Sequence, residues 1–229
     1  MAGGARIVQA PIDGFWRIGR GRDPLAPRPR GPVDFGDSKS GNRWDSATGR
    51  FSVLYFSSTL EGCFGETLGR FRPDPGLAFI EDEWRDRLFM ELGAIPADWR
   101  TRRTAVRASP APGGPSDFLN IQNARNIQLI KKALGPSLAM FGYTDVDLGL
   151  LQGPDRRVTR LVAEWAWTQT TKQEEPRFAG IRYVSRLNPD WELWALFDDI
   201  QLVEHQRSAI LPTMPDLSKV AKLYGLHVH

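Results

Sequence analysis

The segment Phe51 to Leu68 constrains the fold most, because an extended run there passes directly into a helical one. The run FSVLYF is rich in aromatic and β-branched residues and is followed by Ser57-Ser58, which predicts a buried strand. Ser58-Thr59-Leu60-Glu61 has the form of a capping box, so we expect a helix to begin there with Ser58 as its cap. Apolar residues then recur at helical spacing, at Leu60, Cys63, Phe64 and Leu68.

Three residues of this region have the chemistry of a nucleotide site, namely Arg43, Tyr55 and Glu66. An arginine offers a rigid fork for phosphate, a tyrosine offers a flat face for a ring base, and a carboxylate can stabilise a positive sugar carbon. At about 100° per residue, Glu66 lies away from the apolar stripe of its helix. We therefore expect Tyr55 and Glu66 to face one cleft. A core tyrosine and a solvated carboxylate are the alternatives.

Composition excludes several other classes of site. A chain of 229 residues with 41% hydrophobic residues can form one folded domain without disulfides. The single cysteine, Cys63, has apolar neighbours and is predicted to be a buried thiol. With three histidines, two of them in the terminal tail, a zinc site or a catalytic triad is not expected, and we predict no metal.

Charge and hydropathy bear on location and partners. No run approaches the ~20 apolar residues that span a bilayer, and the first residues lack the apolar core of a signal peptide. We therefore expect a soluble, cytoplasmic protein that does not contact a membrane. A net charge of +3 gives little support for direct nucleic-acid binding.

The remaining elements are predicted from local patterns. Alternating prolines and arginines make Gly19 to Gly41 a long loop, and a second loop is expected from Ala108 to Gly114. We expect helices at residues 118–134, after Asp155 and near 217–223, and a helical turn at 96–99. Strands are expected at residues 145–151, 180–185, 191–197 and 200–204, and either a strand or a short helix at 83–92.

Three blocks of the sequence resemble the RES-domain family, which is named for arginine, glutamate and serine. The first is Phe15-Trp16-Arg17-Ile18. The second joins Gly41-Asn42-Arg43-Trp44-Asp45 to Val53-Leu54-Tyr55-Phe56-Ser57 and Gly65-Glu66-Thr67-Leu68. The third is Gly180-Ile181-Arg182-Tyr183-Val184-Ser185-Arg186 with Trp194-Ala195-Leu196-Phe197.

This resemblance implies an ADP-ribosyltransferase-like α/β (α+β) domain, with a split, mixed and mainly antiparallel sheet and flanking helices, over residues 10–203. Residues 204–229 would be a tail with a short peripheral helix. The family degrades NAD, so NAD would be the substrate and no cofactor would be needed. The implied catalytic residues are Glu66, Tyr55 and Arg43. The implied substrate-binding residues are Arg17, Arg43, Tyr55, Ser57 and Ser185, although each could instead have a structural role.

The acceptor of the ADP-ribosyl group is left open, since water would make a glycohydrolase and inorganic phosphate a phosphorylase. The resemblance also implies a toxin with a small helical Xre-type antitoxin as its partner, and homo-oligomers are left open. One rival is a transferase that modifies a protein or nucleic acid, but Phe64-Gly65-Glu66 lacks the second acidic residue typical of arginine-modifying transferases. Another rival is a catalytically silent nucleotide-binding or interaction module.

Overall fold

The computed structural model describes residues 4–28, 31–34, 36–74, 76, 93–96 and 98–228. Its strands are β1 Ile7–Gln9, β2 Phe15–Arg20, β3 Val53–Ser57, β4 Arg103–Pro110, β5 Asp117–Asn120, β6 Gly180–Val184, β7 Glu192–Phe197 and β8 Leu202–Ala209. Its α-helices are α1 Leu60–Leu68, α2 Ala124–Ala139, α3 Leu148–Gln152, α4 Arg156–Trp167 and α5 Pro215–Tyr224, and a 3₁₀ turn, η1, covers Gly69–Phe71.

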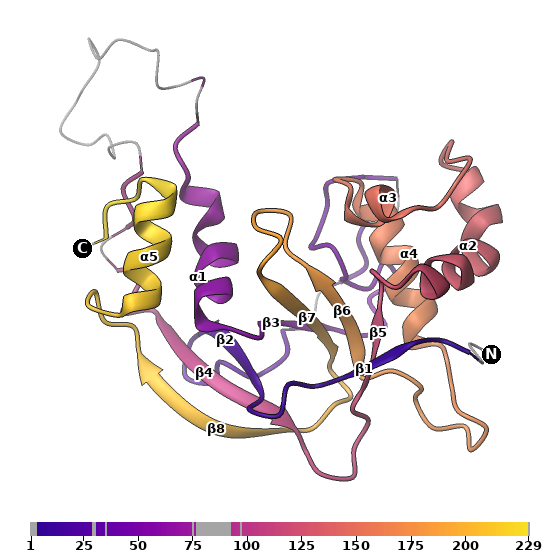
Figure 1. Ribbon diagram of the computed structural model, residues 1–229, viewed down its shortest axis with the longest axis horizontal. Helices are drawn as coiled ribbons and strands as arrows, with labels where there is room; N and C mark the ends of the chain where they lie inside the picture. The colour runs from indigo at the N-terminus through magenta and orange to yellow at the C-terminus, as the bar shows by residue number, and fades with distance from the viewer. Residues whose placement is uncertain are drawn as a thin grey trace.

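The strands form one sheet in the order β1-β5-β6-β7-β3-β2-β4-β8 (Figure 1). Every neighbouring pair is antiparallel except β5 and β6, which confirms the mixed, mainly antiparallel sheet with flanking helices. Strands β2 and β3 share a single register pair, Trp16 opposite Ser57. This narrow junction divides the sheet into two parts, and the two strands separate beyond it.

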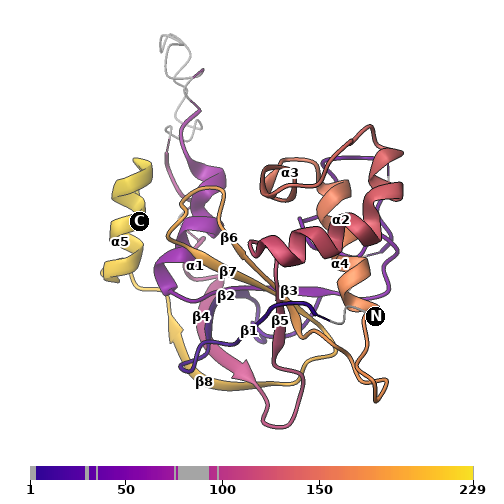
Figure 2. The same ribbon diagram turned by 45° about the vertical axis from the view of Figure 1, so that its right-hand side comes forward.

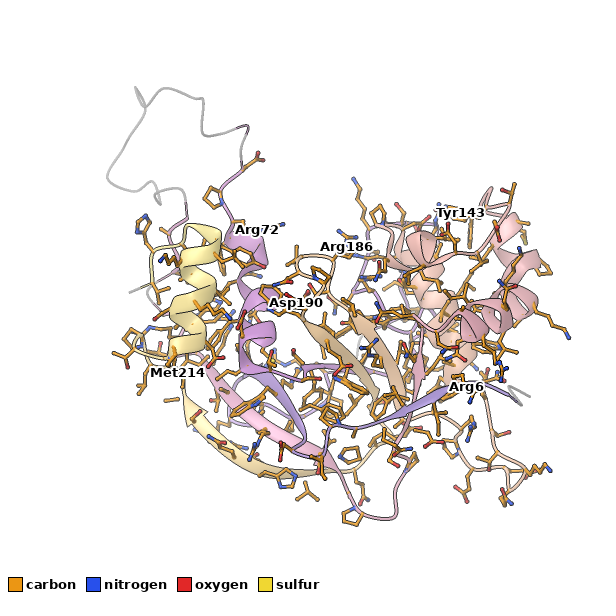
Figure 3. The ribbon with its side chains drawn as sticks, viewed as in Figure 1. Arg6, Arg72, Tyr143, Arg186, Asp190 and Met214 are labelled. Atoms are coloured by element: carbon orange, nitrogen blue, oxygen red, sulfur yellow. The ribbon has the colours of Figure 1, made fainter. Side chains whose placement is uncertain are left out.

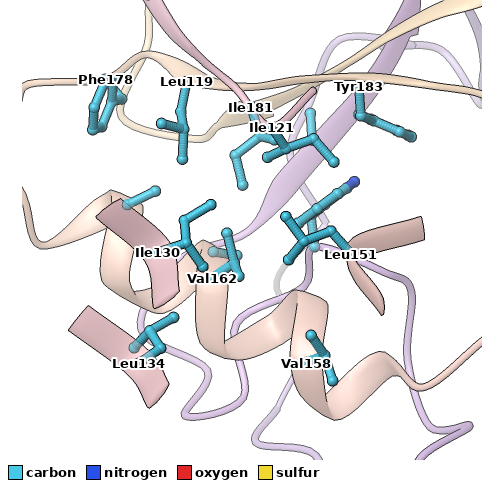
Figure 4. Close-up of a cluster of buried hydrophobic side chains, with 14 of the residues drawn as sticks. Leu119, Ile121, Ile130, Leu134, Leu151, Val158, Val162, Phe178, Ile181 and Tyr183 are labelled. Carbon is cyan, nitrogen blue, oxygen red and sulfur yellow. The ribbon is translucent and has the colours of Figure 1, made fainter. Parts of the chain in front are cut away.

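The helices form two groups that pack on different parts of the sheet (Figures 1 and 2). Helices α1 and α5 bury Phe64, Leu68, Leu217 and Val220 in one apolar cluster beside β2 and β4. Helices α2, α3 and α4 cover β5 and β6 with a second cluster, in which Ile130, Leu151 and Val162 meet Leu119 and Ile181 (Figure 4). Burying these side chains supplies most of the driving force for folding. The two groups flank the junction between β2 and β3.

The passage from β3 into α1 has the expected elements but a different cap. Thr59, not Ser58, caps α1, and its Oγ1 accepts a hydrogen bond from the Gly62 amide. Ser58 Oγ instead donates to Glu192 Oε2 at 2.5 Å, while Glu61 pairs with Lys219 at 2.6 Å. The capping box at Ser58 was a wrong prediction, because partners on β7 and α5 bind both of its side chains.

Two further predictions fail where tertiary contacts decide the local structure. The helix expected at residues 118–134 is strand β5 followed by α2, because Phe118 to Asn120 pair with β6 and Asn123 then caps the helix. The edge strand expected at residues 145–151 is helix α3, whose first turn is capped by the carboxylate of Asp147 on the Leu150 amide at 2.7 Å. Apolar spacing alone did not distinguish these states.

The other expectations divide by region. Helix α4, capped by Asp155, and strands β6 and β7 are confirmed. Strand β4 continues to Pro110, so the loop expected from Ala108 begins at residue 111. Residues 83–92 lie outside the described part of the chain, as does residue 97 of the expected helical turn. Strand β8 begins at residue 202, two residues after the expected start. It runs through residue 203, where the domain was expected to end and the tail to begin. Helix α5, in the expected tail, contributes buried side chains to the apolar cluster that it shares with α1.

Candidate active site

A cavity of ≈ 790 Å³ opens above the place where β2 and β3 separate. Arg17, Arg43, Tyr55 and Glu66 line it, so four of the six predicted site residues come together. Ser185 stands directly behind Glu66, within hydrogen-bonding distance of its carboxylate. Residues from α1, η1, the loop before β3, the start of α4 and the end of β6 complete the walls.

The carboxylate of Glu66 is held in one orientation by Ser185. Ser185 Oγ donates to Glu66 Oε1 at 2.5 Å and accepts a hydrogen bond from the Leu187 amide at 2.9 Å. The serine is 5% exposed at the end of β6, whereas Glu66 is exposed to the cavity. A charge-assisted hydrogen bond of this kind restricts rotation of the carboxylate, and the other carboxylate oxygen, Oε2, is not bonded to Ser185.

Tyr55 presents its ring rather than an acid or base. Its hydroxyl donates to Asp45 Oδ1 at 3.0 Å and accepts from the Trp44 amide at 3.0 Å. Burial, and then the negative charge of Asp45, raise the pKa of Tyr55 well above its usual value. The phenol therefore stays neutral and is fully engaged, so the ring is the part of Tyr55 that a ligand can contact.

Arg43 lies beside two aromatic rings, Trp44 and Tyr183, which also contact each other at 5.4 Å between centroids. Its guanidinium carbon is 5.5 Å from the Trp44 ring and 5.6 Å from the Tyr183 ring, and Nη2 donates to the Leu151 carbonyl at 2.7 Å. Burial lowers its pKa from the usual value, and within the described residues Nε has no hydrogen-bond partner. A partly buried cation that lines the cavity and is only partly bonded is suited to receive an anionic ligand.

Arg17 bridges the gap between the two separated strands. Its Nη1 donates to the Tyr55 carbonyl at 2.9 Å and its Nε to the Pro24 carbonyl at 2.8 Å. Burial lowers the pKa of this guanidinium. Arg17 thus fastens β2 to β3 and to the proline-arginine loop, and it contributes charge to the cavity floor while much of its donor capacity is used.

Ser57 and Cys63 are both buried. Ser57 is fully buried, donates to the Glu192 carbonyl at 2.9 Å and is absent from the cavity lining, so its position does not favour the predicted binding role. Cys63 is buried as predicted, and its thiol donates to the Trp16 carbonyl at 2.9 Å. Burial raises the pKa of the Cys63 thiol to about 12, which makes it a poor nucleophile.

Sequence reasoning did not single out most of the charge around the cavity. Among the described residues, seven cationic side chains line it against one carboxylate, Glu66. Five of the seven were not predicted, namely Lys39, Arg70, Arg72, Arg156 and Arg186. Figure 3 shows Arg72 beyond the end of α1 and Arg186 beside the β6–β7 hairpin, on opposite sides of the site. Arg70 lies in η1, which continues directly from α1, so its position four residues after Glu66 could have identified it, because residues about one turn apart lie near each other.

Arg156 and Arg160, at the start of α4, position the loop that carries Arg43. Arg156 Nη1 donates to the carbonyls of Lys39 and Gly41, and Arg160 Nη2 donates to that of Asp37. Arg160 is fully buried. These bonds tie one wall of the cavity to the helices that cover β5 and β6.

The fold and site together define a class, a mixed α/β domain with a mainly antiparallel sheet and a strongly cationic cavity around an oriented carboxylate. The family model for the RES domain matches residues 15–215, and the chain belongs to this family. The fold is also that of a chain in the crystal structure of the M. tuberculosis MbcT–MbcA toxin–antitoxin complex, with a TM-score of 0.52 and 12% identity. That match covers 96% of this chain and 92% of the other. No curated protein matches the sequence.

No helix in the described part of the chain has the length and apolar character needed to cross a bilayer. The described residues also bring together no group of three or more histidine, cysteine or acidic side chains that could hold a metal ion.

Proposed function

We propose that this protein degrades NAD by cleaving the bond between nicotinamide and ribose. The observation that carries the proposal is the Glu66–Ser185 pair, a single oriented carboxylate in a cavity with seven cations. Arg43 and the lining cations Lys39, Arg156 and Arg186 suit the pyrophosphate of a dinucleotide. The carboxylate suits the positive charge that develops on the ribose as the bond breaks. Membership of the RES-domain family supports the same chemistry.

Each residue would have a distinct role. Arg43, with Arg17 beneath it, would bind the pyrophosphate, and the ring face of Tyr55 would stack on nicotinamide. Glu66 would bind the ribose hydroxyls and stabilise the oxocarbenium-like carbon.

The chemistry needs no general acid. When the glycosidic C–N bond breaks, its electron pair stays on nicotinamide, which departs as a neutral molecule. A lone pair of water or of phosphate then forms the new C–O bond, and water loses one proton to solvent. The products are nicotinamide with ADP-ribose, or with ADP-ribose-1''-phosphate.

A proposal about the biological role is supported by the structural comparison. The structurally similar chain comes from a toxin–antitoxin complex. We propose that this protein is likewise a toxin that acts in the cytoplasm, restrained by a small helical Xre-type antitoxin that covers the cavity. Expression of the chain in bacteria should lower cellular NAD and arrest growth, and the variant Glu66→Ala should do neither.

The direct test follows NAD consumption by the pure protein, with and without inorganic phosphate. We expect wild type to release nicotinamide. In Glu66→Ala, kcat/KM should fall at least about a hundredfold, and in Arg43→Ala at least about tenfold. Arg125→Ala is the matched control, since Arg125 is an exposed residue of α2 outside the cavity lining. Full turnover by Glu66→Ala would show that the mechanism is wrong.

Labelled NAD separates this proposal from its two rivals. Free ADP-ribose or its phosphate supports degradation, whereas label on a protein or nucleic acid supports a transferase. The residue two positions before Glu66 is Phe64, which is fully buried, so this strand-helix unit offers no second acidic group to the cavity. Unchanged NAD would favour a silent binding module.

A further inference from the structure

Three arginines, Arg20, Arg70 and Arg103, lie near one another, and Arg70 lines the cavity. Arg20 and Arg103 are direct cross-strand partners on β2 and β4, an arrangement in which like charges repel. Arg103 is 8% exposed, donates to the Trp99 carbonyl at 2.8 Å and lies 4.6 Å from the Trp99 ring. Burial, and then the nearby charges of Arg20 and Arg70, lower the pKa of Arg103 to about 10. The fold therefore holds three cations together at a cost in stability.

Arg70 connects this group to the cavity. It belongs to η1, lines the cavity and is exposed. Its one aromatic contact in the described part of the chain is with the Phe71 ring, at 4.8 Å. Arg20 is exposed as well, and neither guanidinium has an ion-pair partner among the described residues. The nearby carboxylate of Asp98 binds Arg102 at 2.7 Å.

The position of Arg70 separates it from the reacting ribose. It lies four residues after Glu66, in the 3₁₀ turn that follows α1, so the two backbone positions are about 6 Å or more apart along the axis. The opposite wall already supplies Lys39, Arg43, Arg156 and Arg186 for the two phosphates of a pyrophosphate. The charge on the α1–η1 side is therefore in excess of what NAD requires.

We propose that Arg70, with Arg20 and Arg103 beside it, binds a third phosphate of the substrate, and that the enzyme accepts NADP at least as well as NAD. NADP differs from NAD by a 2'-phosphate on the adenosine ribose, a group of nearly two negative charges with three acceptor oxygens. Two exposed arginine forks and one buried cation match that group. The proposal rests on the proposed function and specifies its substrate class.

Binding of nucleotides without a cleavable bond tests the subsite separately from catalysis. By calorimetry, wild type should bind adenosine 2',5'-bisphosphate at least about tenfold more tightly than 5'-AMP. Arg70→Ala should remove most of that preference, Arg70→Lys should keep part of it, and Arg125→Ala should keep all of it. Because Arg70 is exposed and its replacement by alanine relieves repulsion, the unfolding midpoint of Arg70→Ala should equal or exceed that of wild type, and that of Arg70→Lys should match it. Equal binding of the two nucleotides to wild type would overturn the proposal.

Turnover of NAD and NADP then separates failure of the proposed function from failure of the phosphate subsite. We expect kcat/KM for NADP to equal or exceed that for NAD, and Arg70→Ala to lower the NADP value about ten- to hundredfold while changing the NAD value less than threefold. If neither dinucleotide is consumed but the bisphosphate preference holds, the proposed function fails and the phosphate subsite stands. If NAD is consumed without that preference, the subsite fails alone. If Arg70→Ala instead abolishes a stimulation of NAD turnover by inorganic phosphate, the site serves free phosphate and the NADP assignment is wrong.

Discussion

Replacing Ser185 with alanine tests whether the carboxylate of Glu66 must be held in one orientation. The substitution removes the 2.5 Å hydrogen bond to Glu66 Oε1 and the acceptor of the Leu187 amide, and it changes no charge. A hydrogen bond to an ionised group contributes about 1.5–3 kcal/mol, and the lower end applies because Glu66 faces solvent. We therefore expect kcat for NAD to fall about 10- to 30-fold, with KM nearly unchanged.

The assay is steady-state release of nicotinamide, measured together with the unfolding midpoint. Ser46→Ala is a matched control, because Ser46 is 4% exposed and donates to Glu164 Oε1 at 2.6 Å, away from the cavity lining. Both variants should lose about 1–2 kcal/mol of stability. Only Ser185→Ala should lose kcat. A kcat within twofold of wild type, or an equal fall in Ser46→Ala, would refute the argument that orientation of Glu66 matters.

Three further predictions concern binding, packing and pH. Arg43→Lys should raise KM for NAD about tenfold with a small change in kcat, because lysine has neither the fork nor the planar face, and initial-rate kinetics would show it. Gly65→Ala would place a Cβ 2.0 Å from Trp191 Cζ3, so the unfolding midpoint should fall by several degrees; an unchanged midpoint would contradict this packing. Burial raises the pKa of Asp155, but hydrogen bonds, chiefly from Arg157, outweigh it and lower the value to about 2 from 3.8. Because the pKa of Asp155 is lower in the folded protein, its ionised form adds about 2 kcal/mol to the free energy of unfolding above pH 4, and this contribution is lost as the pH falls to 2. Asp155→Asn should therefore unfold more easily than wild type at pH 7 but not at pH 2.

Elements that depend on neighbouring residues in the sequence were predicted well. The strand before Ser57, the helix after Asp155 and the two strands around Asn188 carry their own apolar patterns and their own turn or cap residues. The failures share one cause. The segment from Phe118 has helical spacing throughout, but its first residues pair with β6, which comes about 60 residues later. Pairing with a distant strand leaves no local signature.

The residues of the candidate site also fall into those that could be predicted from the sequence and those that could not. Arg43, Tyr55 and Glu66 lie within 24 residues, and a strand that turns directly into a helix brings the last two together. The arrangement of Ser185 against Glu66 depends on α1 and the end of β6 meeting across the junction between β2 and β3, and the family resemblance was needed to anticipate it. Arg156 could not be anticipated, because it lines the cavity only through the packing of α4 against the loop before β3.

By itself, the sequence determined the strand-to-helix unit, the single carboxylate and the chemistry it suits, because these depend on residue type and on contacts between near neighbours. The tertiary structure decided that β2 and β3 separate beyond Trp16, that a cavity opens there, and that seven cations surround it. Like charges repel, so no local pattern favours gathering them. They are held together because burial of the two apolar clusters stabilises the fold by more than the repulsion costs.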